Sequence, residues 1–395
     1  MKETNIIKIL QEPVDIPPVV LEKAQGAFEK VKREAEEESK TKPAVRRKSR
    51  KRFWLAAAVA AAILGTVSVG AAAYHHWWSK GLSESLHASE GQMQELDGSK
   101  ASSLINQSVT VQGVTITAVQ SIVDNYFAHL SFKVEGYDLP KGAEPGIENI
   151  EVTVDGDDNI NWSGGFYNGI VSGENAMAEY GDGTPLEFAE DGSLIEKYVQ
   201  EDGSLEFDLT LSHYLEERGY LFGKEIHVKL SNLGTYEKTD FHPVLEGTWE
   251  FDWTLQGSDK VQISKPEAPL GESGAVLKEA ELSPISMRAV LEVPAGQYTV
   301  DESEEGMNPP QLKGAVMKDG TVYSCLYPGM GGSSRLSEES DQYITLFALD
   351  RILEVDQVEK LLFAKESLSE GNVPLEEEHP EDQPLEKRFY VVPLD

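Results

Sequence analysis

The sequence has almost no cysteine, and this scarcity removes several kinds of site at once. Cys325 is the single cysteine in 395 residues, so the chain can form no internal disulfide and no cysteine-based zinc site. We expect Cys325 to be a small core residue on a strand, since it lies in the apolar segment VYSCLYP. A chain of this length can bury a sufficient core without disulfides, so the lack of cysteine does not exclude an exported domain.

The common signatures of catalysis and of cofactor binding are also missing. No G-x-S-x-G, H-E-x-x-H, Walker or G-x-G-x-x-G motif occurs. The glycine-rich segment 329–334 lacks the lysine of a phosphate loop, so we expect a flexible loop there. The segment 155–159, DGDDN, lacks the glycine and the glutamate of a calcium loop and predicts a hairpin turn. We therefore predict a protein that is not an enzyme and that binds no cofactor and no metal ion.

Positive charge is scarce and is concentrated at one end of the chain. The formal net charge is -33, which disfavours nucleic acid as a partner. Residues 1–52 carry 14 Lys/Arg and 9 Asp/Glu, a net charge of +5, whereas the rest of the chain carries 21 and 59, a net charge of -38. A boundary this sharp indicates that the two parts lie in different environments.

An uncharged segment begins where the charge changes. Residues 53–74 read FWLAAAVAAAILGTVSVGAAAY, and 22 helical residues span about 33 Å, enough for a hydrocarbon core of about 30 Å. Basic residues stay on the cytoplasmic side, and six precede the segment: Arg46, Arg47, Lys48, Arg50, Lys51 and Arg52. The pattern predicts a single-pass protein of the cell membrane, in contact with the lipid bilayer, with its N-terminus in the cytoplasm and its C-terminal domains outside the cell.

Other interpretations of this segment are weaker. The alanines at 71–73 resemble a signal-peptide cleavage site, but 52 residues precede the apolar stretch, far more than a normal n-region. A buried core helix is disfavoured by the six neighbouring basic residues. A stripe of small residues could also pack two such helices together: Ala58, Ala62, Thr66 and Gly70.

The tail at 1–52 is too short for a core of its own, yet it contains an amphipathic pattern. Residues 17–38 predict a helix with an apolar stripe on one face and charged residues on the other. The stripe consists of Val20, Ala24, Phe28 and Val31. Because the tail offers nothing to cover this stripe, we expect it to bind a cytoplasmic partner; the alternative is that it lies on the inner leaflet of the membrane.

Beyond the predicted span the pattern changes to strands. Residues 79–104 are polar and predict a short stalk or helix, and residues 108–134 alternate as three strands with turns at Gly113 and at Asp124-Asn125. Further strands are expected along the remaining chain, at 148–154, 204–211, 224–232, 247–255, 275–293, 312–328, 342–350, 357–364 and 387–393. No helical pattern alternates with them, which disfavours a parallel sheet.

The predicted fold class is mostly β: two extracytoplasmic immunoglobulin-like β-sandwich domains, one transmembrane helix and a short helical cytoplasmic tail. The predicted boundaries are a tail at 1–52, a transmembrane helix at 53–74, a stalk at 75–104, a β-sandwich domain with an irregular insertion at 105–256, a linker at 257–272 and a second β-sandwich domain at 273–395.

The chain also resembles a known family. The basic tail, the alanine-rich span, the opening at 109–134, LEGTWEFDWTL at 245–255 and ELSPISMRAVLEV at 281–293 together resemble domain-of-unknown-function family 4179 of Gram-positive membrane proteins. Members often carry an immunoglobulin-like C-terminal domain. Some are regarded as anti-sigma factors or are encoded beside extracytoplasmic-function sigma factors, so the resemblance implies a regulatory role, but it assigns no functional residues.

Two hypotheses of function follow. In the first, the protein is an anti-sigma-factor-like membrane regulator: its outer β domains sense an envelope signal, and its inner helix binds a sigma factor. In the second, it is a cell-surface binding or adhesion module for an extracellular protein or glycan, and its tail only sets the topology.

Overall fold

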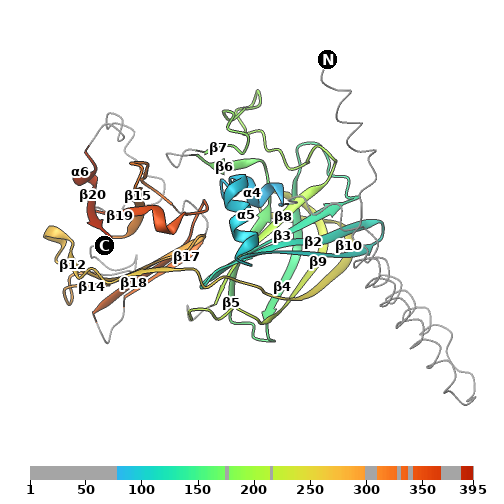
Figure 1. Cartoon of the computed structure of the whole chain (residues 1–395). Coiled ribbons are helices and arrows are strands. Elements are labelled where there is room, and N and C mark those ends of the chain that lie inside the picture. The colour runs from blue at the N-terminus through green and yellow to red at the C-terminus, as the bar shows by residue number, and fades with distance from the viewer. Residues whose placement is uncertain are drawn as a thin grey trace, which may run out of the picture. The chain divides into compact units, whose positions relative to one another are not determined.

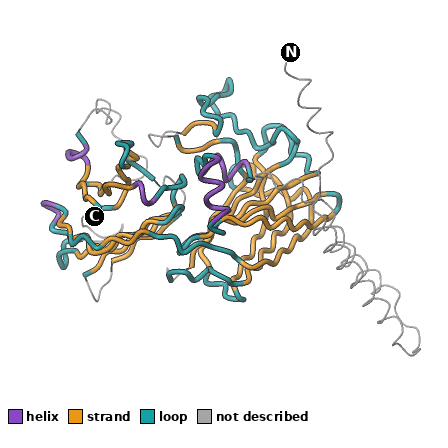
Figure 2. Tube along the Cα trace, viewed as in Figure 1, coloured by secondary structure: helices purple, strands orange, loops and turns teal. Residues whose placement is uncertain are grey.

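The computed structural model describes residues 78–173, 178–213, 217–298, 309–326, 331–336, 341–365 and 384–394. The predicted tail and the predicted membrane helix lie outside these residues. Within them no helix is long and apolar enough to cross a membrane. Strands predominate, as predicted, and helices are few and short (Figure 2). Residues Trp78–Asp395 form one compact unit.

The first β region, residues 102–254, contains two antiparallel sheets (Figure 1). The five-stranded sheet has the order β1-β2-β3-β8-β5, and the three-stranded sheet has the order β10-β9-β4. Their bounds are Ser102–Val111 (β1), Val114–Val123 (β2), Phe127–Glu135 (β3), Glu144–Val154 (β4), Ile160–Phe166 (β5), Leu205–His213 (β8), Glu225–Glu237 (β9) and Asp240–Thr254 (β10). The three strands expected over 108–134 are β1, β2 and β3, and both predicted turns are confirmed.

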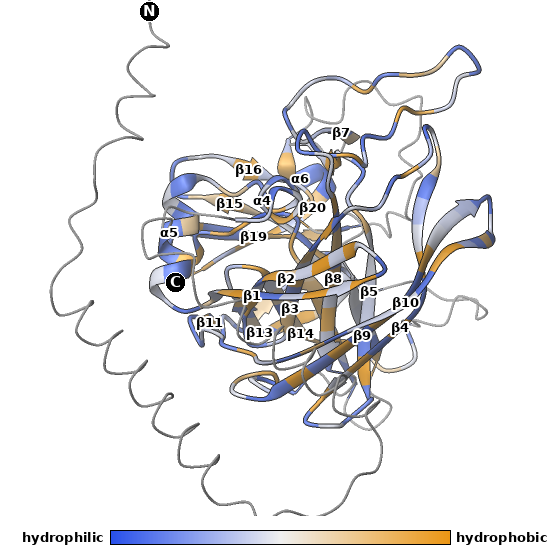
Figure 3. Cartoon of the chain, turned by 90° about the vertical axis from the view of Figure 1, so that its right-hand side faces the viewer, coloured by the Kyte–Doolittle hydropathy of each residue, from blue (hydrophilic) through white to orange (hydrophobic). Residues whose placement is uncertain are grey.

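The core of this region lies between the two sheets, since buried side chains of both belong to one cluster. Phe132 of β3 packs against Phe251 of β10, with ring centroids 5.5 Å apart. Alternate residues of a strand point to opposite faces, and hydropathy alternates accordingly along β4, β9 and β10 (Figure 3). The sheets also meet at an edge, where the side-chain amides of Gln107 on β1 and of Gln112 in the turn after it donate to the carbonyls of Asp252 and Glu246 on β10.

The segment 155–200, expected to be an irregular insertion, contains a strand of the main sheet. The predicted turn at 155–159 is confirmed: Asp155 and Gly156 both have positive φ, as a type I′ hairpin turn requires. β5 follows the turn and pairs with β8 along its full length. A small ribbon comes next, formed by β6 (Ile170–Ser172) and β7 (Ala178–Tyr180).

The second β region, residues 262–393, also contains two antiparallel sheets. One has the order β11-β13-β14-β18-β17, with β12 also paired to β13, and the other has the order β16-β15-β19-β20. Their bounds are Gln262–Ser264 (β11), Ala268–Pro269 (β12), Val276–Leu282 (β13), Ser286–Glu292 (β14), Leu312–Met317 (β15), Val322–Tyr323 (β16), Gly332–Leu336 (β17), Gln342–Ala348 (β18), Val358–Ala364 (β19) and Phe389–Pro393 (β20). The short helical elements here are Gly271–Ser273 (η1), Val355–Gln357 (η2) and Leu385–Arg388 (α6).

Three local expectations need correction in this region. Residues of the expected linker at 257–272 form β11 and β12, which pair with β13. The glycine-rich segment 329–334 was expected to be a loop, but its residues from Gly332 onward belong to β17, which pairs with β18. Cys325 follows β16 rather than lying on a strand, and it is half-buried rather than a core residue.

The aromatic core of the first β region generates a stability prediction. Phe132 is fully buried and contacts the rings of Phe207, Phe251 and Trp253, so we expect Phe132→Ala to lower the free energy of unfolding by about 3–5 kcal/mol. Denaturant unfolding measures this loss. The matched control is Phe188→Ala, because Phe188 is 63% exposed and its removal is expected to change stability by less than about 0.5 kcal/mol. Equal effects of the two variants would contradict this core.

Candidate functional site

The four residues predicted to bind a cytoplasmic partner, Val20, Ala24, Phe28 and Val31, lie outside the described residues, so their role stays a prediction. The first described residue, Trp78, follows the predicted membrane segment closely. The helices that come directly after it are therefore the described part nearest in sequence to the predicted membrane crossing. They are α4 (Lys80–Ser85) and α5 (Glu90–Gly98).

The leucines of these helices are buried in one cluster with both β regions. Leu82 and Leu86 come from α4 and the turn after it, and Leu96 comes from α5. We call this set the junction cluster. Its members are Leu82, Leu86, Leu96, Ala101, Ile122, Tyr126, Phe127, Ile285, Leu346, Ala348 and Ile352. The segment expected to be a polar stalk is thus packed into the β structure from Trp78 onward.

A carboxylate holds the start of α4 on the five-stranded sheet. The side chain of Glu206 on β8 accepts hydrogen bonds from the backbone N–H groups of Lys80 and Gly81 and from the hydroxyl of Ser79. These N–H groups belong to the first turn, which has no partners within the helix. Glu206 is itself buried. The contact therefore satisfies a helix end and a buried carboxylate together.

A second carboxyl group lies beside the first under the same helix. Asp208 is two residues after Glu206, so both side chains project from the same face of β8. Burial, reinforced by the neighbouring Glu206 carboxylate, raises the pKa of Asp208 to about 8. Gly81 leaves room for the pair, because a Cβ there would lie 2.7 Å from an oxygen of each carboxyl group and would force the two side chains to move. At neutral pH the fold therefore favours a protonated Asp208.

α5 connects the same segment to the second β region. The helix starts with a capping box, in which the hydroxyl of Ser89 accepts the backbone N–H of Gln92 and the side chain of Gln92 accepts the N–H of Ser89. The amide of Gln92 also donates to the carbonyl of Ile352 at 3.0 Å. The N–H of Ile352 in turn donates to the carbonyl of Leu86 at 2.9 Å. The turn between the two helices is thus bonded directly to the second β region.

Buried polar contacts join the two β regions around the cluster. The hydroxyl of Tyr126 donates to Glu281 at 2.9 Å, and the guanidinium of Arg288 donates to the same carboxylate at 2.8 Å. Ser286 donates to Asp124 at 2.6 Å, and burial raises the pKa of the Asp124 carboxyl. Removal of one partner from a buried ion pair such as Arg288 and Glu281 is strongly destabilising, because the other charge is left without a partner.

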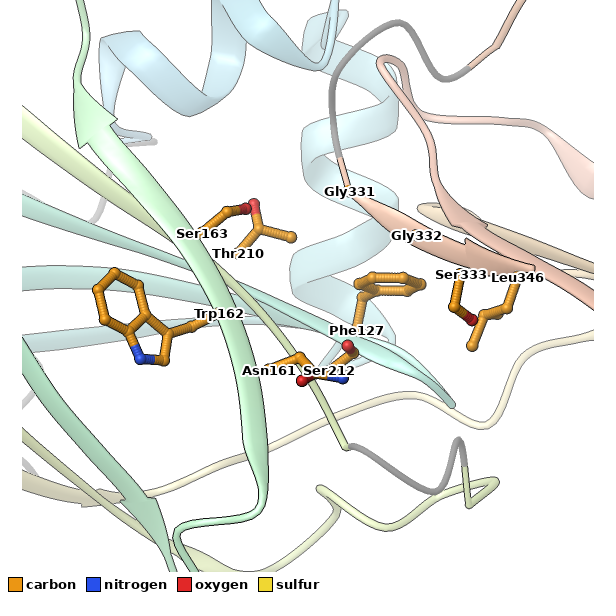
Figure 4. A pocket seen from close by; sticks show the side chains of 10 residues that line it. All are labelled: Phe127, Asn161, Trp162, Ser163, Thr210, Ser212, Gly331, Gly332, Ser333 and Leu346. Atoms are coloured by element: carbon orange, nitrogen blue, oxygen red, sulfur yellow. The ribbon is translucent and has the colours of Figure 1, made fainter. Parts of the chain in front are cut away.

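A pocket opens at the rim of the junction cluster (Figure 4). Its volume is about 350 Å³, and its lining comes from β3, β5 and β8 of the first β region and from β17 and β18 of the second. The lining residues are Phe127, Asn161, Trp162, Ser163, Thr210, Ser212, Gly331, Gly332, Ser333 and Leu346. The ring of Trp162 projects to the other side of β5 from Phe127 (Figure 4). Phe127 and Leu346 belong both to this lining and to the junction cluster.

The sequence contained signals for part of this site. Leu82 and Leu86 are four residues apart, and Ser89-x-x-Gln92 has the spacing of a capping box; both are typical of a helix with a buried side. No local signal points to Glu206 and Asp208, because the residues at the start of α4 that Glu206 binds lie more than 120 residues away. Among the described residues, no group of three or more His, Cys, Asp or Glu side chains could hold a metal ion.

The comparisons with known proteins reach only part of the chain. Residues 46–136 match the family model described as "Domain of unknown function (DUF4179)", a range that runs from the basic residues before the predicted span to the end of β3. No curated protein matches. Among solved structures, the chain is similar to the conserved domain protein from Bacillus anthracis, with 15% identity and a TM-score of 0.39, over 68% of this chain and 79% of that one.

The raised pKa of Asp208 predicts a stability change with a definite sign. Because the pKa is about 3.8 in an exposed chain and about 8 in the fold, the fold is favoured below about pH 4 and loses stability as the pH rises from 4 to 8. Asp208→Asn removes this titration. We expect the variant to be more stable than the parent at pH 8, by a margin that disappears toward pH 4, as measured by melting temperature across this range.

Asp202→Asn is the matched control, because it removes an aspartate whose pKa is shifted in the opposite direction. Hydrogen bonds from Lys133 and from Ser204 hold the pKa of Asp202 well below its usual range, so its contribution to stability is present above about pH 4 and is lost as the pH falls. Asp202→Asn should therefore weaken the protein at pH 8. A melting temperature of Asp208→Asn that tracks the parent at every pH would show that Asp208 is not held in its protonated form.

Proposed function

We propose that this chain, whose residues 46–136 belong to the DUF4179 family, is a single-pass membrane regulator. Its tail at 1–52 lies in the cytoplasm, its span is the segment 53–74, and its β regions are extracytoplasmic sandwiches of immunoglobulin-like type. The observation that carries the proposal is the burial of Leu82, Leu86 and Leu96 in one cluster with both β regions. A change in the β regions thereby reaches the segment that enters the membrane.

The distance along the chain supports this transmission. Five residues separate the end of the predicted span at Tyr74 from the start of α4 at Lys80. Five residues reach at most about 18 Å when fully extended, so little slack is available between the two helices. Movement of α4 on the sheet is therefore transmitted to the span rather than absorbed by a long linker.

The inner end of the proposed pathway is the tail helix. The sequence of residues 1–52 predicts no core that would cover the apolar stripe, and the family resemblance makes a sigma factor the partner to test first. A sigma factor held at the membrane cannot act on transcription, so release from the tail would be the output. An amphipathic helix that lays its apolar face into a groove is a common way to bind a protein partner.

The partner-binding step is tested by Phe28→Asp in the full-length protein. We expect the variant to lose co-purification of a cytoplasmic partner and to change the transcripts that depend on that partner, because a charge is placed in the middle of the stripe. Gly26→Asp is the matched control, since it adds the same charge on the face of the predicted helix opposite the stripe. If the full-length protein captures no cytoplasmic partner and Phe28→Asp changes no transcript, the surface-binding hypothesis replaces this one.

The transmission step is tested by Leu86→Ala. Leu86 is fully buried, and its truncation should cost about 2–5 kcal/mol at the junction while leaving both β cores intact. We expect faster amide hydrogen exchange in α4 and α5 and an altered level of the regulated transcripts. Leu104→Ala is the control, because Leu104 is 63% exposed. If the amides of α4 exchange faster but the regulated transcripts stay at the parent level, the junction cluster does not transmit the signal.

A further inference from the structure

We propose that the pocket between β5, β8 and β17 (Figure 4) binds an uncharged saccharide. The binding step does not depend on the proposed function. The consequence of binding does, because it assigns this pocket as the place where an extracellular ligand acts on the junction cluster.

The first argument is the chemistry of the lining. None of the ten lining residues carries a charge, although the chain beyond residue 52 has a net charge of -38. The polar side chains are four hydroxyls and one carboxamide, from Ser163, Thr210, Ser212, Ser333 and Asn161. A hydroxyl both donates and accepts hydrogen bonds, and so does each hydroxyl of a sugar. A charged ligand would find no opposite charge in this lining.

The second argument is the apolar side of the pocket. Phe127 and Leu346 lie on this side, where only narrow edges of their side chains reach the pocket, since their exposed fractions are 2% and 1%. A sugar ring carries C–H groups on its faces as well as hydroxyls at its rim, so small apolar contacts bordered by hydroxyls suit it. The volume of about 350 Å³ is near the lower end of the roughly 300–1,000 Å³ of ligand pockets, which suits one or two sugar rings.

The third argument is that parts of the lining are fixed before any ligand arrives. Thr210 Oγ1 lies in a hydrogen bond 3.0 Å from Nδ1 of His129, a side chain only 1% exposed. Burial lowers the pKa of His129 to about 4, so the ring is neutral at physiological pH and the pair keeps the lining uncharged. Gly331, at the edge of the lining, has a φ of +92°, a backbone conformation that favours glycine.

Occupation of the pocket would reach α4 through two shared residues. Phe127 and Leu346 touch the pocket and are also packed in the junction cluster with Leu82 and Leu86. A ligand that binds one arrangement of these side chains better than another shifts the population of the arrangements. In the frame of the proposed function, this couples saccharide binding to the position of the membrane-proximal helix.

The binding test uses the full-length protein in lipid nanodiscs, since maltoside detergents would themselves present sugars to the pocket. Calorimetric titration with N-acetylglucosamine tetramer and with maltotetraose supplies two neutral saccharides. A galacturonate tetramer supplies an anionic one, and tetra-alanine supplies a small peptide. We expect saturable binding of at least one neutral saccharide and none of the galacturonate tetramer.

Ser163→Leu fills the pocket from an exposed position on β5 and should raise the dissociation constant at least tenfold. Ser108→Leu is the matched control, because Ser108 is an exposed serine on β1 that lies opposite Thr117 in the register, as Ser163 lies opposite Thr210. This variant should bind like the parent. The proposal is overturned if neither neutral saccharide binds saturably, if only tetra-alanine binds, or if Ser163→Leu binds like the parent while its melting temperature is unchanged.

A second measurement separates this proposal from the proposed function. Amide hydrogen exchange in α4 and α5 is recorded with and without the saccharide that binds. Slower or faster exchange there, lost in Ser163→Leu, supports both the pocket and its coupling to the junction. Saturable binding that leaves the exchange of both helices unchanged supports the pocket as a saccharide site and contradicts the transmission that the proposed function requires.

Discussion

The contact on which the arrangement depends most is the one between Glu206 and the first turn of α4. It places a buried carboxylate against backbone N–H groups that have no other partner, and it thereby fixes the helix on β8. Each side of the contact needs the other. Without α4, Glu206 would be freely hydrated and the adjacent polar face of the sheet would be open to water; without Glu206, the start of the helix would have unsatisfied donors in a buried position.

That face of the five-stranded sheet is unusual for a face covered by other parts of the protein. It carries Glu206, Asp208 and His129, and it leaves Asp208 Oδ1 and His129 Nε2 buried without a hydrogen-bond partner. Burial without a partner costs free energy, and the shifted pKa values of Asp208 and His129 express this cost. The opposite face of the same strands is a conventional aromatic core. The stability of the first β region therefore comes mainly from the aromatic core face of this sheet. The polar face, which carries α4, contributes less.

The sequence allowed the strands to be predicted wherever the alternation was strong. The three strands over 108–134 follow from period-two patterns and from turn residues that tolerate positive φ, and Gly113 has such a φ. β5 was missed because NWSGG has no alternation; its strand character comes from pairing with β8. β11, β12 and β17 were missed for the same reason, since each is a short strand defined by its neighbour.

The candidate site was hardest to predict because its parts are distant in sequence. A helix at 80–98 could have been expected from the leucine spacing and the capping box, but not the surface that covers it. The carboxyl pair on β8, the strand β5 and the start of β17 acquire meaning only when the chain folds. The tail helix and the span were predicted from local composition alone; they lie outside the described residues and stay predictions.

The packing of the segment after the predicted span supports the proposed regulator rather than a static anchor. Leu82, Leu86 and Leu96 are buried with side chains of both β regions. A coupling of about 1–3 kcal/mol, the usual size between two sites, is what the proposed transmission through this cluster requires. A surface-binding module needs only a hydrated spacer between membrane and domain. Here the segment is instead buried among both β regions, in a cluster that shares Phe127 and Leu346 with the pocket, and this packing favours the proposed transmitter over a tether.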